Sequence, residues 1–295
     1  MRKILVSNSS REGKKLAKML GYSFCRATTR EKYPDTERVV GIEGKITKPA
    51  DVIYWQFNNI DPFDGQIFNL LAFVAKFSDP RITDLVLPYT PYGRCTALAG
   101  NEVDKLYFLL GQLSEMTKKV HLVVIHHDFH QANKSRAEFE NILTINVDDQ
   151  LVAFLKKKFK SPVVLVSPDV GFSKTVKRLA DRMGVDWFPL SKKRISPTAV
   201  TIIGTLRAKK TIEKNKRAKF VLIDDIVSTG ETMSQASKFL RVSGVGQRNI
   251  SYVAVHDTRR KEMYPRMKVF CSNSLFTNHS SFDIIRSVHK ELAGK

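Results

Sequence analysis

Short apolar runs alternate along this chain with longer stretches of helical periodicity. Lys3 to Ser7, Val52 to Gln56 and Leu85 to Pro88 have the length and composition of buried strands. Between the last two, apolar residues from Ile67 to Phe77 recur every three or four positions, which predicts an amphipathic helix. This alternation is typical of βαβ units, whose helices cover a mainly parallel sheet. The chain is therefore predicted to have an α/β fold.

The alternation of predicted strands and helices begins a second time near residue 148, and we place the domain boundary there. A chain of 295 residues exceeds the roughly 100 to 200 residues of one typical domain. We therefore predict two α/β domains, residues 1–147 and 148–295. Further helices are expected at Glu102 to Met116, Asp148 to Phe159, Ser173 to Met183 and Glu231 to Leu240, and further strands at Val120 to Ile125, Val163 to Val166, Phe220 to Ile223 and Ile250 to Val255.

The first helix can be bounded from its end residues. Ser9 is followed three positions later by Glu12, which predicts a capping box at the start of the helix. Gly21 stands where a helix that begins there should end.

The composition predicts a globular protein without membrane spans. Hydrophobic residues make up 42% of the chain, enough to offset the entropy lost on folding. No apolar run approaches the roughly 18 residues of a membrane-spanning helix, and the first residues lack a signal-peptide pattern, so a cytoplasmic location is expected. Cys25, Cys95 and Cys271 are odd in number and widely spaced, which argues against a disulfide framework or a zinc cage and predicts ordinary thiols.

The charge balance points to anionic ligands. The chain has 49 Lys and Arg against 29 Asp and Glu, a net charge of +20. Such a field attracts nucleic acids, acidic lipids and phosphorylated metabolites alike, and an ordinary solvated basic surface gives the same number. The basic run from Arg207 to Lys219 suits a nucleic-acid patch, but a solvated hairpin or mobile loop is the favoured interpretation.

The stretch from Phe220 to Met233, FVLIDDIVSTGETM, carries the clearest chemistry. A buried strand delivers Asp224 and Asp225, whose carboxylates can accept hydrogen bonds from sugar hydroxyls or hold a divalent cation. The turn Ser228 to Gly230 then opens a helix, where backbone N–H groups and the helix dipole favour a phosphate. An ordinary strand-to-helix turn capped by Ser228 or Thr229 is the simpler alternative.

This stretch resembles the fingerprint for phosphoribosyl diphosphate (PRPP) shared by type I phosphoribosyltransferases and ribose-phosphate diphosphokinases, also called PRPP synthetases. The resemblance implies that one group of residues holds ribose 5-phosphate: Asp224, Asp225, Ser228, Thr229, Gly230 and Thr232.

Two further segments resemble the synthetases. The run SPDVG, followed by basic residues, is similar to a family segment in which Asp169 would contact the sugar or a metal ion. The run from Ser191 to Thr198 is similar to the family's catalytic loop, and it implies Lys192 and Arg194 as the catalytic pair. Basic side chains on such an extended loop neutralise charge that develops on a transferring phosphoryl group.

The first predicted domain carries segments that resemble the family's ATP site. The run PYTPYGR implies that Arg94 contacts ATP. Tyr33, Asp35 and Glu37 belong to a segment that, in the family, meets the adenine from a neighbouring subunit. An aromatic ring such as that of Tyr33 suits stacking on the base.

A histidine-rich segment, VIHHDFH, occupies the place of a family motif whose histidine lies near metal and triphosphate. His126, His127 and His130 all compete for this role, and His126 is chosen because it directly follows the predicted strand, with Asp169 as the second residue near Mg²⁺. His126 and His130 stand four positions apart, so zinc binding is an alternative, although the segment offers no third ligand in register.

The resemblance extends from about Ile4 to His256. It implies two tandem phosphoribosyltransferase-like domains, an ATP side in 1–147 and a ribose 5-phosphate and PRPP side in 148–295. The implied enzyme of nucleotide biosynthesis uses Mg²⁺ to transfer a diphosphoryl group from ATP to ribose 5-phosphate, giving PRPP and AMP. A homo-oligomer built from dimers is implied as well, and neither a membrane nor a nucleic-acid partner is expected.

Two other functions stay open at this point. One is a transferase that consumes PRPP. The other is a catalytically weakened binding or regulatory subunit, which the departures from the family pattern at Cys95, Val124 and Phe172 support. The Lys192 and Arg194 pair argues against a pure binding protein, because such a protein has no transition state to stabilise.

Overall fold

The computed structural model describes residues 2–31, 38–93, 103–123, 139–160, 162–194, 200–259, 267–276 and 279–294. It divides into two compact units. Unit 1 comprises residues 1–147, 274–278 and 284–295, and unit 2 comprises residues 148–273 and 279–283. Each unit holds a mainly parallel sheet flanked by helices, which confirms the predicted α/β fold.

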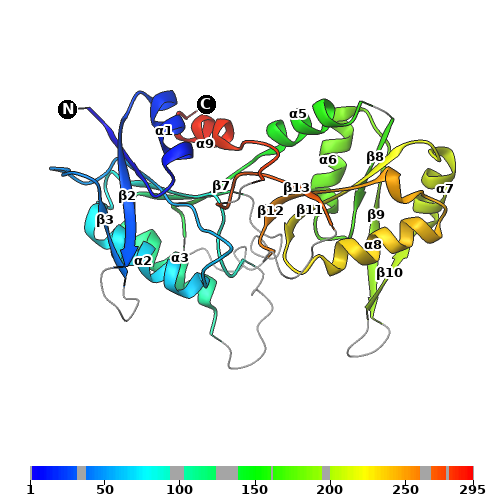
Figure 1. Cartoon of the computed structure of the whole chain (residues 1–295), viewed down its shortest axis with the longest axis horizontal. Helices are drawn as coiled ribbons and strands as arrows, with labels where there is room; N and C mark the ends of the chain where they lie inside the picture. Colours follow the sequence, from blue (N-terminus) through cyan, green and yellow to red (C-terminus); the bar gives the residue numbers. More distant parts are fainter. Residues whose placement is uncertain are drawn as a thin grey trace. The chain divides into compact units, whose positions relative to one another are not determined.

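In the described part of unit 1 the sheet has seven strands in the order β3-β2-β1-β4-β5-β6-β7. All neighbours are parallel except the antiparallel pair β2 and β3. Helices α1 and α9 lie on one face of the sheet, and α2 and α3 lie on the other (Figure 1). The elements are β1 Ile4–Ser7, α1 Ser10–Leu20, β2 Ser23–Glu31, β3 Arg38–Ile42, β4 Val52–Tyr54, α2 Phe63–Phe77, β5 Asp84–Leu87, α3 Lys105–Met116, β6 Lys119–Val123, β7 Ile142–Ile145 and α9 Ile285–Leu292.

In the described part of unit 2 the sheet has six strands in the order β10-β9-β8-β11-β12-β13. Only β9 and β10 are antiparallel. Side chains of α7 and α8 pack with one face of the sheet in a continuous core that includes Ile212, Leu240 and Phe220. The elements are α5 Asp148–Lys158, β8 Val163–Ser167, α6 Ser173–Met183, β9 Trp187–Arg194, β10 Val200–Gly204, α7 Leu206–Lys214, β11 Lys219–Val227, α8 Glu231–Val242, a 3-10 turn Gln247–Asn249, β12 Ile250–Asp257 and β13 Val269–Cys271.

The end residues of α1 behave partly as predicted. Gly21 ends the helix in the left-handed conformation, with φ of 71°, and its N–H bonds carbonyls of the last turn. The predicted capping box is wrong, because the hydroxyl of Ser9 donates to the carboxylate of Glu12 instead of accepting from the backbone.

The basic run after Arg207 is a helix, so the favoured hairpin or loop was wrong. Thr205 caps α7 by accepting a hydrogen bond from the N–H of Ala208. Ala208 and Ile212, four positions apart, are the buried residues of α7, and they anchor an otherwise exposed, basic helix.

The C-terminal helix α9 lies in unit 1, whereas the predicted boundary puts it in the second domain. It packs on α1 and β7 and buries Ile285 and Val288 there. An apolar stripe on a short helix needs a partner face, and here that face belongs to the first sheet. Within the described residues, no helix is long and apolar enough to cross a membrane.

Candidate active site

The carboxyl ends of β8 and β11 bring the predicted sugar-phosphate residues to one edge of the unit 2 sheet. The two strands are parallel neighbours, and their last registered pair is Leu222 with Val166. Beyond that pair, β11 continues to Val227 and stays bonded to β12 alone. The predicted strand end at Ile223 was therefore four residues short, and Asp224 and Asp225 lie within the strand.

Both acidic side chains are largely withdrawn from solvent. Asp224 is 9% exposed and Asp225 is 5% exposed. The carboxylate of Asp224 accepts the N–H of Asp225 at 3.1 Å, and that of Asp225 accepts the N–H of Ile226 at 2.7 Å. These local bonds fix the orientation of both carboxylates, as recognition of sugar hydroxyls or of a cation requires.

The turn after β11 has the backbone geometry of an anion-binding helix start. Gly230 precedes α8 with φ of 77°, a left-handed conformation that a glycine adopts without strain. The N–H of Glu231 bonds the hydroxyl of Thr229 at 3.3 Å. The first N–H groups of a helix have no partner within the helix, and its dipole favours negative charge there. Ser228 and Thr229 lie in this turn and Thr232 in the first turn of α8, at a helix start of the kind that suits a phosphate.

Asp169 lies in the turn that follows β8. Its side chain is half-buried and accepts the N–H of Gly171 at 2.9 Å, while the hydroxyl of Ser167 donates to its carbonyl at 2.6 Å. Phe172, the bulky departure from the family pattern, is 7% exposed and stands at the start of α6. Its ring therefore packs into the protein instead of standing in solvent over the turn.

Lys192 and Arg194 lie in β9, not in the extended loop that was expected. Their backbones pair with Ile202 and Val200 of β10, which supplies the hydrogen-bond partners that a free loop lacks. Since β9 pairs with β8 only as far as Pro189, the β9–β10 hairpin continues past the carboxyl edge that carries Asp169 (Figure 1). The side chains of the pair lie outside the described part of the structure.

The remaining predicted site residues, Tyr33, Asp35, Glu37, Arg94 and His126, lie outside the described residues.

A polar groove of about 870 Å³ lies beside β2 and β3 in unit 1. Arg26, Arg30 and Arg38 line it, and the last two flank the segment with the predicted adenine residues. Arg26 pairs with Glu43 at 3.0 Å and Arg38 with Asp61 at 3.3 Å. Hydrogen bonds from Asn58 and Arg38 lower the pKa of Asp61.

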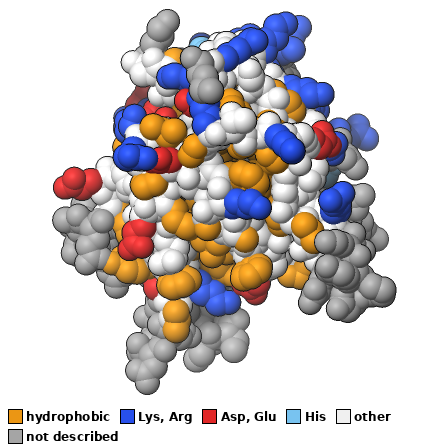
Figure 2. Space-filling view, turned by 90° about the vertical axis from the view of Figure 1, so that its left-hand side faces the viewer, with side chains coloured by type: hydrophobic (Ala, Val, Ile, Leu, Met, Phe, Trp, Pro, Cys, Tyr) orange, Lys and Arg blue, Asp and Glu red, His pale blue; other side chains and the backbone are white. Residues whose placement is uncertain are grey.

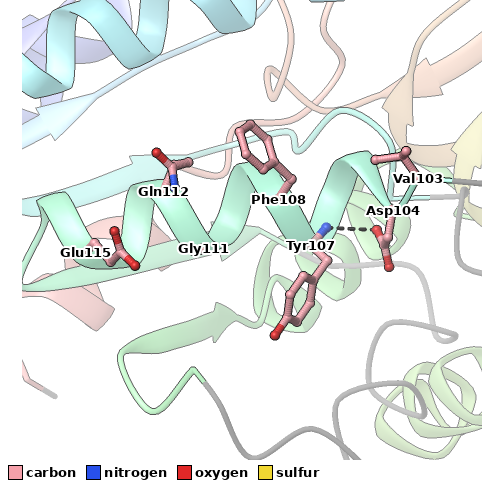
Figure 3. A pocket seen from close by; sticks show the side chains of 7 residues that line it. All are labelled: Val103, Asp104, Tyr107, Phe108, Gly111, Gln112 and Glu115. Carbon is pink, nitrogen blue, oxygen red and sulfur yellow. Dashed lines mark hydrogen bonds between the residues drawn. The ribbon is translucent and has the colours of Figure 1, made fainter.

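A smaller hollow of about 560 Å³ runs along α3 and contains none of the predicted site residues (Figure 3). Asp104 caps this helix by accepting the N–H of Tyr107 at 2.8 Å, the contact drawn in the figure. Phe108 and Val103 are exposed at 61% and 76%. The hollow is an open strip of helix surface.

Basic side chains are most numerous toward the top and right of the face seen in Figure 2. Lys and Arg are spread over it, between hydrophobic and acidic side chains. This distribution resembles a solvated basic surface more than the continuous stripe typical of nucleic-acid binding.

The sequence interpretation missed a cluster at the ends of β12 and β13. Asp257, Cys271 and His279 place their ligand atoms within 4.8 Å of one another. Burial, together with the nearby Asp257 carboxylate, raises the pKa of Cys271 to about 12. No periodicity or short spacing joins these positions, so only the adjacency of the two strands could have indicated the cluster.

The chain is similar in sequence to a protein family and to several named enzymes. Residues 135–284 match the family model described as "Phosphoribosyl transferase domain". Among similar proteins, the ribose-phosphate pyrophosphokinase of Methanobrevibacter smithii is 25% identical, with 94% of each chain covered. That of Pyrococcus furiosus is 29% identical over 72% of each chain, and that of Bacillus caldolyticus is 25% identical over 82% of this chain and 74% of its own.

A solved structure extends the similarity to the fold of both units. The crystal structure of phosphoribosylpyrophosphate synthetase from Mycobacterium smegmatis matches 100% of this chain and 98% of its own, with a TM-score of 0.75 and 18% identity. At this identity the match shows a shared fold.

Proposed function

The chain belongs to the phosphoribosyltransferase-domain family, and on that premise we propose that it is a ribose-phosphate pyrophosphokinase. This enzyme transfers the diphosphoryl group of ATP to ribose 5-phosphate and gives PRPP and AMP. One observation carries the proposal: the buried pair Asp224 and Asp225, followed by the Gly230 turn into α8, lies at the same sheet edge as Asp169. The similar proteins named above, which cover most of both chains, carry that name.

The sugar phosphate is held by groups of two kinds. Asp224 and Asp225 accept hydrogen bonds from ribose hydroxyls, since ionised carboxylates are acceptors only. Ser228, Thr229 and Thr232 donate to the 5-phosphate, and Gly230 allows the backbone to turn into α8 beneath it. This leaves the anomeric hydroxyl free to react.

The oxygen donor of Asp169 also fits Mg²⁺. The carboxylate of Asp169, oriented by Gly171, is an oxygen ligand of the type that Mg²⁺ prefers, and His126 is the second residue proposed near the ion. When bound, Mg²⁺ neutralises charge on the phosphates of ATP.

In the transfer, the anomeric oxygen forms a bond to the β-phosphorus while the bond from that phosphorus to the α,β-bridging oxygen breaks. The hydroxyl loses its proton and AMP leaves with the bridging oxygen. Lys192 and Arg194 stabilise the charge that develops on the transferring group and the leaving oxygen. Their place on a hairpin beyond the carboxyl edge supports this role.

The ATP side is proposed for unit 1. Arg94 contacts ATP, and the segment with Tyr33, Asp35 and Glu37 meets the adenine from a neighbouring subunit. The proposal therefore includes a homo-oligomer built from dimers, which light scattering coupled to size-exclusion chromatography would measure. A cytoplasmic location remains a prediction from the sequence.

The direct test incubates the purified chain with ATP, Mg²⁺ and ribose 5-phosphate and follows AMP by chromatography. We expect AMP to form only when the sugar phosphate is present. A chain that binds PRPP but forms no AMP would instead be the regulatory subunit, and diphosphate release from PRPP that depends on an added base would indicate the consuming transferase.

Three variants connect the activity to residues. Asp225→Asn should raise the KM for ribose 5-phosphate roughly 10- to 100-fold, because a hydrogen bond to a charged group is lost. Lys192→Ala should lower kcat about 100-fold or more. Lys210→Ala, on the exposed face of α7, is the matched control and should leave both constants unchanged. Full turnover by Lys192→Ala would remove its catalytic assignment.

A further inference from the structure

A cluster with three kinds of ligand atom lies at the carboxyl edge of unit 2, outside the residues used above. Asp257 ends β12 and Cys271 ends its parallel neighbour β13, and both side chains are buried. His279 lies in the following segment and is exposed. A carboxylate oxygen, the thiol sulfur and an imidazole nitrogen lie within 4.8 Å of one another.

The carboxylate of Asp257 is held in place by Arg259. The guanidinium donates from Nε to Oδ1 at 2.8 Å and from Nη2 to Oδ2 at 2.7 Å, and its Nη1 donates to the carbonyl of Met267 at 2.8 Å. Oδ1 also accepts the backbone N–H of Arg259 at 3.2 Å, so Oδ2, with one bond, is the oxygen that retains acceptor capacity for an ion. Partners of this kind orient metal-ligating carboxylates.

The segment with His279 is tied to the end of β13 by backbone bonds. The N–H of Ser281 donates to the carbonyl of Cys271 at 2.7 Å, and Ser272 forms a β-bridge with Phe282. The hydroxyl of Ser272 also donates to Val255 of β12 at 2.6 Å. The three ligand-bearing segments are thus held together before any ion binds.

The types of ligand atom in the cluster indicate which kind of metal ion it would bind. Two ligand atoms on one tetrahedral Zn²⁺ lie about 3.5 Å apart, so the cluster needs a closure of only about 1 Å, which the exposed His279 side chain can make. Sulfur and imidazole nitrogen suit Zn²⁺ or Co²⁺, whereas Mg²⁺ prefers oxygen ligands. We propose that Asp257, Cys271 and His279 bind one such transition-metal ion, with water at the fourth position on the open, His279 side.

The site lies next to the sugar-phosphate turn without sharing a residue with it. Asp257 is registered with Val227 of β11, and the N–H of Thr258 donates to the carbonyl of Val227 at 2.9 Å. Ser228 is the next residue of the chain. A bound ion would cross-link β12, β13 and residues 279–283, and so stabilise the side of the turn that β12 supports.

Cobalt titration of the full chain tests the proposal without reference to activity. In a Cys25→Ser/Cys95→Ser background Cys271 is the one remaining thiol, so thiolate-to-cobalt charge-transfer absorption can come from it alone. We expect this absorption to saturate at one Co²⁺ per chain, to disappear on addition of Zn²⁺ and to resist excess Mg²⁺. Absence of the absorption in the folded chain would overturn the proposal.

Two variants in that background identify the ligands. Cys271→Ser should abolish the charge-transfer absorption. His279→Asn, at an exposed position, should retain it but weaken Co²⁺ binding at least about tenfold. Unchanged affinity in His279→Asn would exclude the three-residue site, even if Cys271→Ser fails to fold.

Discussion

The turn at Asp79 concentrates several bonds on one carboxylate. It accepts from Arg81 through Nε at 3.0 Å, Nη2 at 2.7 Å and the backbone N–H at 2.8 Å. The guanidinium bonds, followed by the backbone bond, lower the pKa of Asp79 to about 2. In the unfolded chain this carboxyl group should titrate near its ordinary pKa of about 3.9.

The pKa shift at Asp79 predicts acid-sensitive stability. A pKa that is lower in the folded state gives a stabilisation present above about pH 4 and lost as the pH falls toward 2. Asp79→Asn should therefore melt at a lower temperature than the parent at pH 6, and the difference should shrink between pH 4 and pH 2. A melting difference that stays constant over this range would contradict the assignment.

Two glycines in helices show how closely a helix packs against its neighbours. A Cβ on Gly13 of α1 would lie 2.5 Å from the Cβ of Ser7 on β1, so the helix can approach the strand only because this position lacks a side chain. Gly65, exposed near the start of α2, has nothing within 4 Å of the same added atom.

The same substitution should therefore have opposite effects in the two helices. Gly13→Ala should lower the free energy of unfolding by about 1 to 3 kcal/mol through overpacking. Gly65→Ala should raise it by about 0.5 kcal/mol through helix propensity. Chemical denaturation of both variants measures this, and a loss of stability in both would show that close packing at Ser7 is not the cause.

Elements that bury an apolar run could be predicted from the sequence. Helix α6 was predicted with its observed bounds, and β8 within one residue, because both carry strong local patterns. Helix α7 was missed because it buries two residues, Ala208 and Ile212. Two apolar positions are too few to show the helical periodicity of hydrophobic residues. The β9–β10 hairpin was missed because its stability comes from pairing between backbones, which the side-chain pattern does not encode.

The residues of the candidate site also differ in whether the sequence alone could indicate them. Asp224, Asp225 and Gly230 could be found because strand, turn and helix follow one another directly in the chain. Asp257 and Cys271 come together through the β12–β13 pairing, and His279 joins them through a bond of Ser281 to β13. Contacts of this kind depend on topology, which no local motif in these residues indicates.

Helix α9, near the carboxyl end of the chain, makes the stability of unit 1 depend on residues far from it in the sequence. Val288 is fully buried where α9 packs with α1 and β7. His121 of β6, 3% exposed, has Glu291 of α9 at 3.8 Å from Nδ1 and Asp84 at 3.6 Å from Nε2. The last helix thus completes one face of the first sheet.

A matched pair of substitutions in α9 tests this dependence. Val288→Ala should reduce the stability of unit 1 by roughly 2 kcal/mol, because it leaves a cavity in a packed interface. Arg286→Ala, on the exposed side of the same helix, should change it little. Hydrogen exchange should show faster opening of β1 and β7 in Val288→Ala and unchanged protection in β11 and β12.

Because α9 belongs to unit 1, it limits where the chain can be cut into fragments or exchanged with a related protein. A single break after Val147 would leave the amino-terminal fragment without the helix that closes its sheet, and the other fragment with a helix that has lost its partner face. The chain passes between the two units four times, after residues 147, 273, 278 and 283, so a viable chimera must keep all four crossings matched.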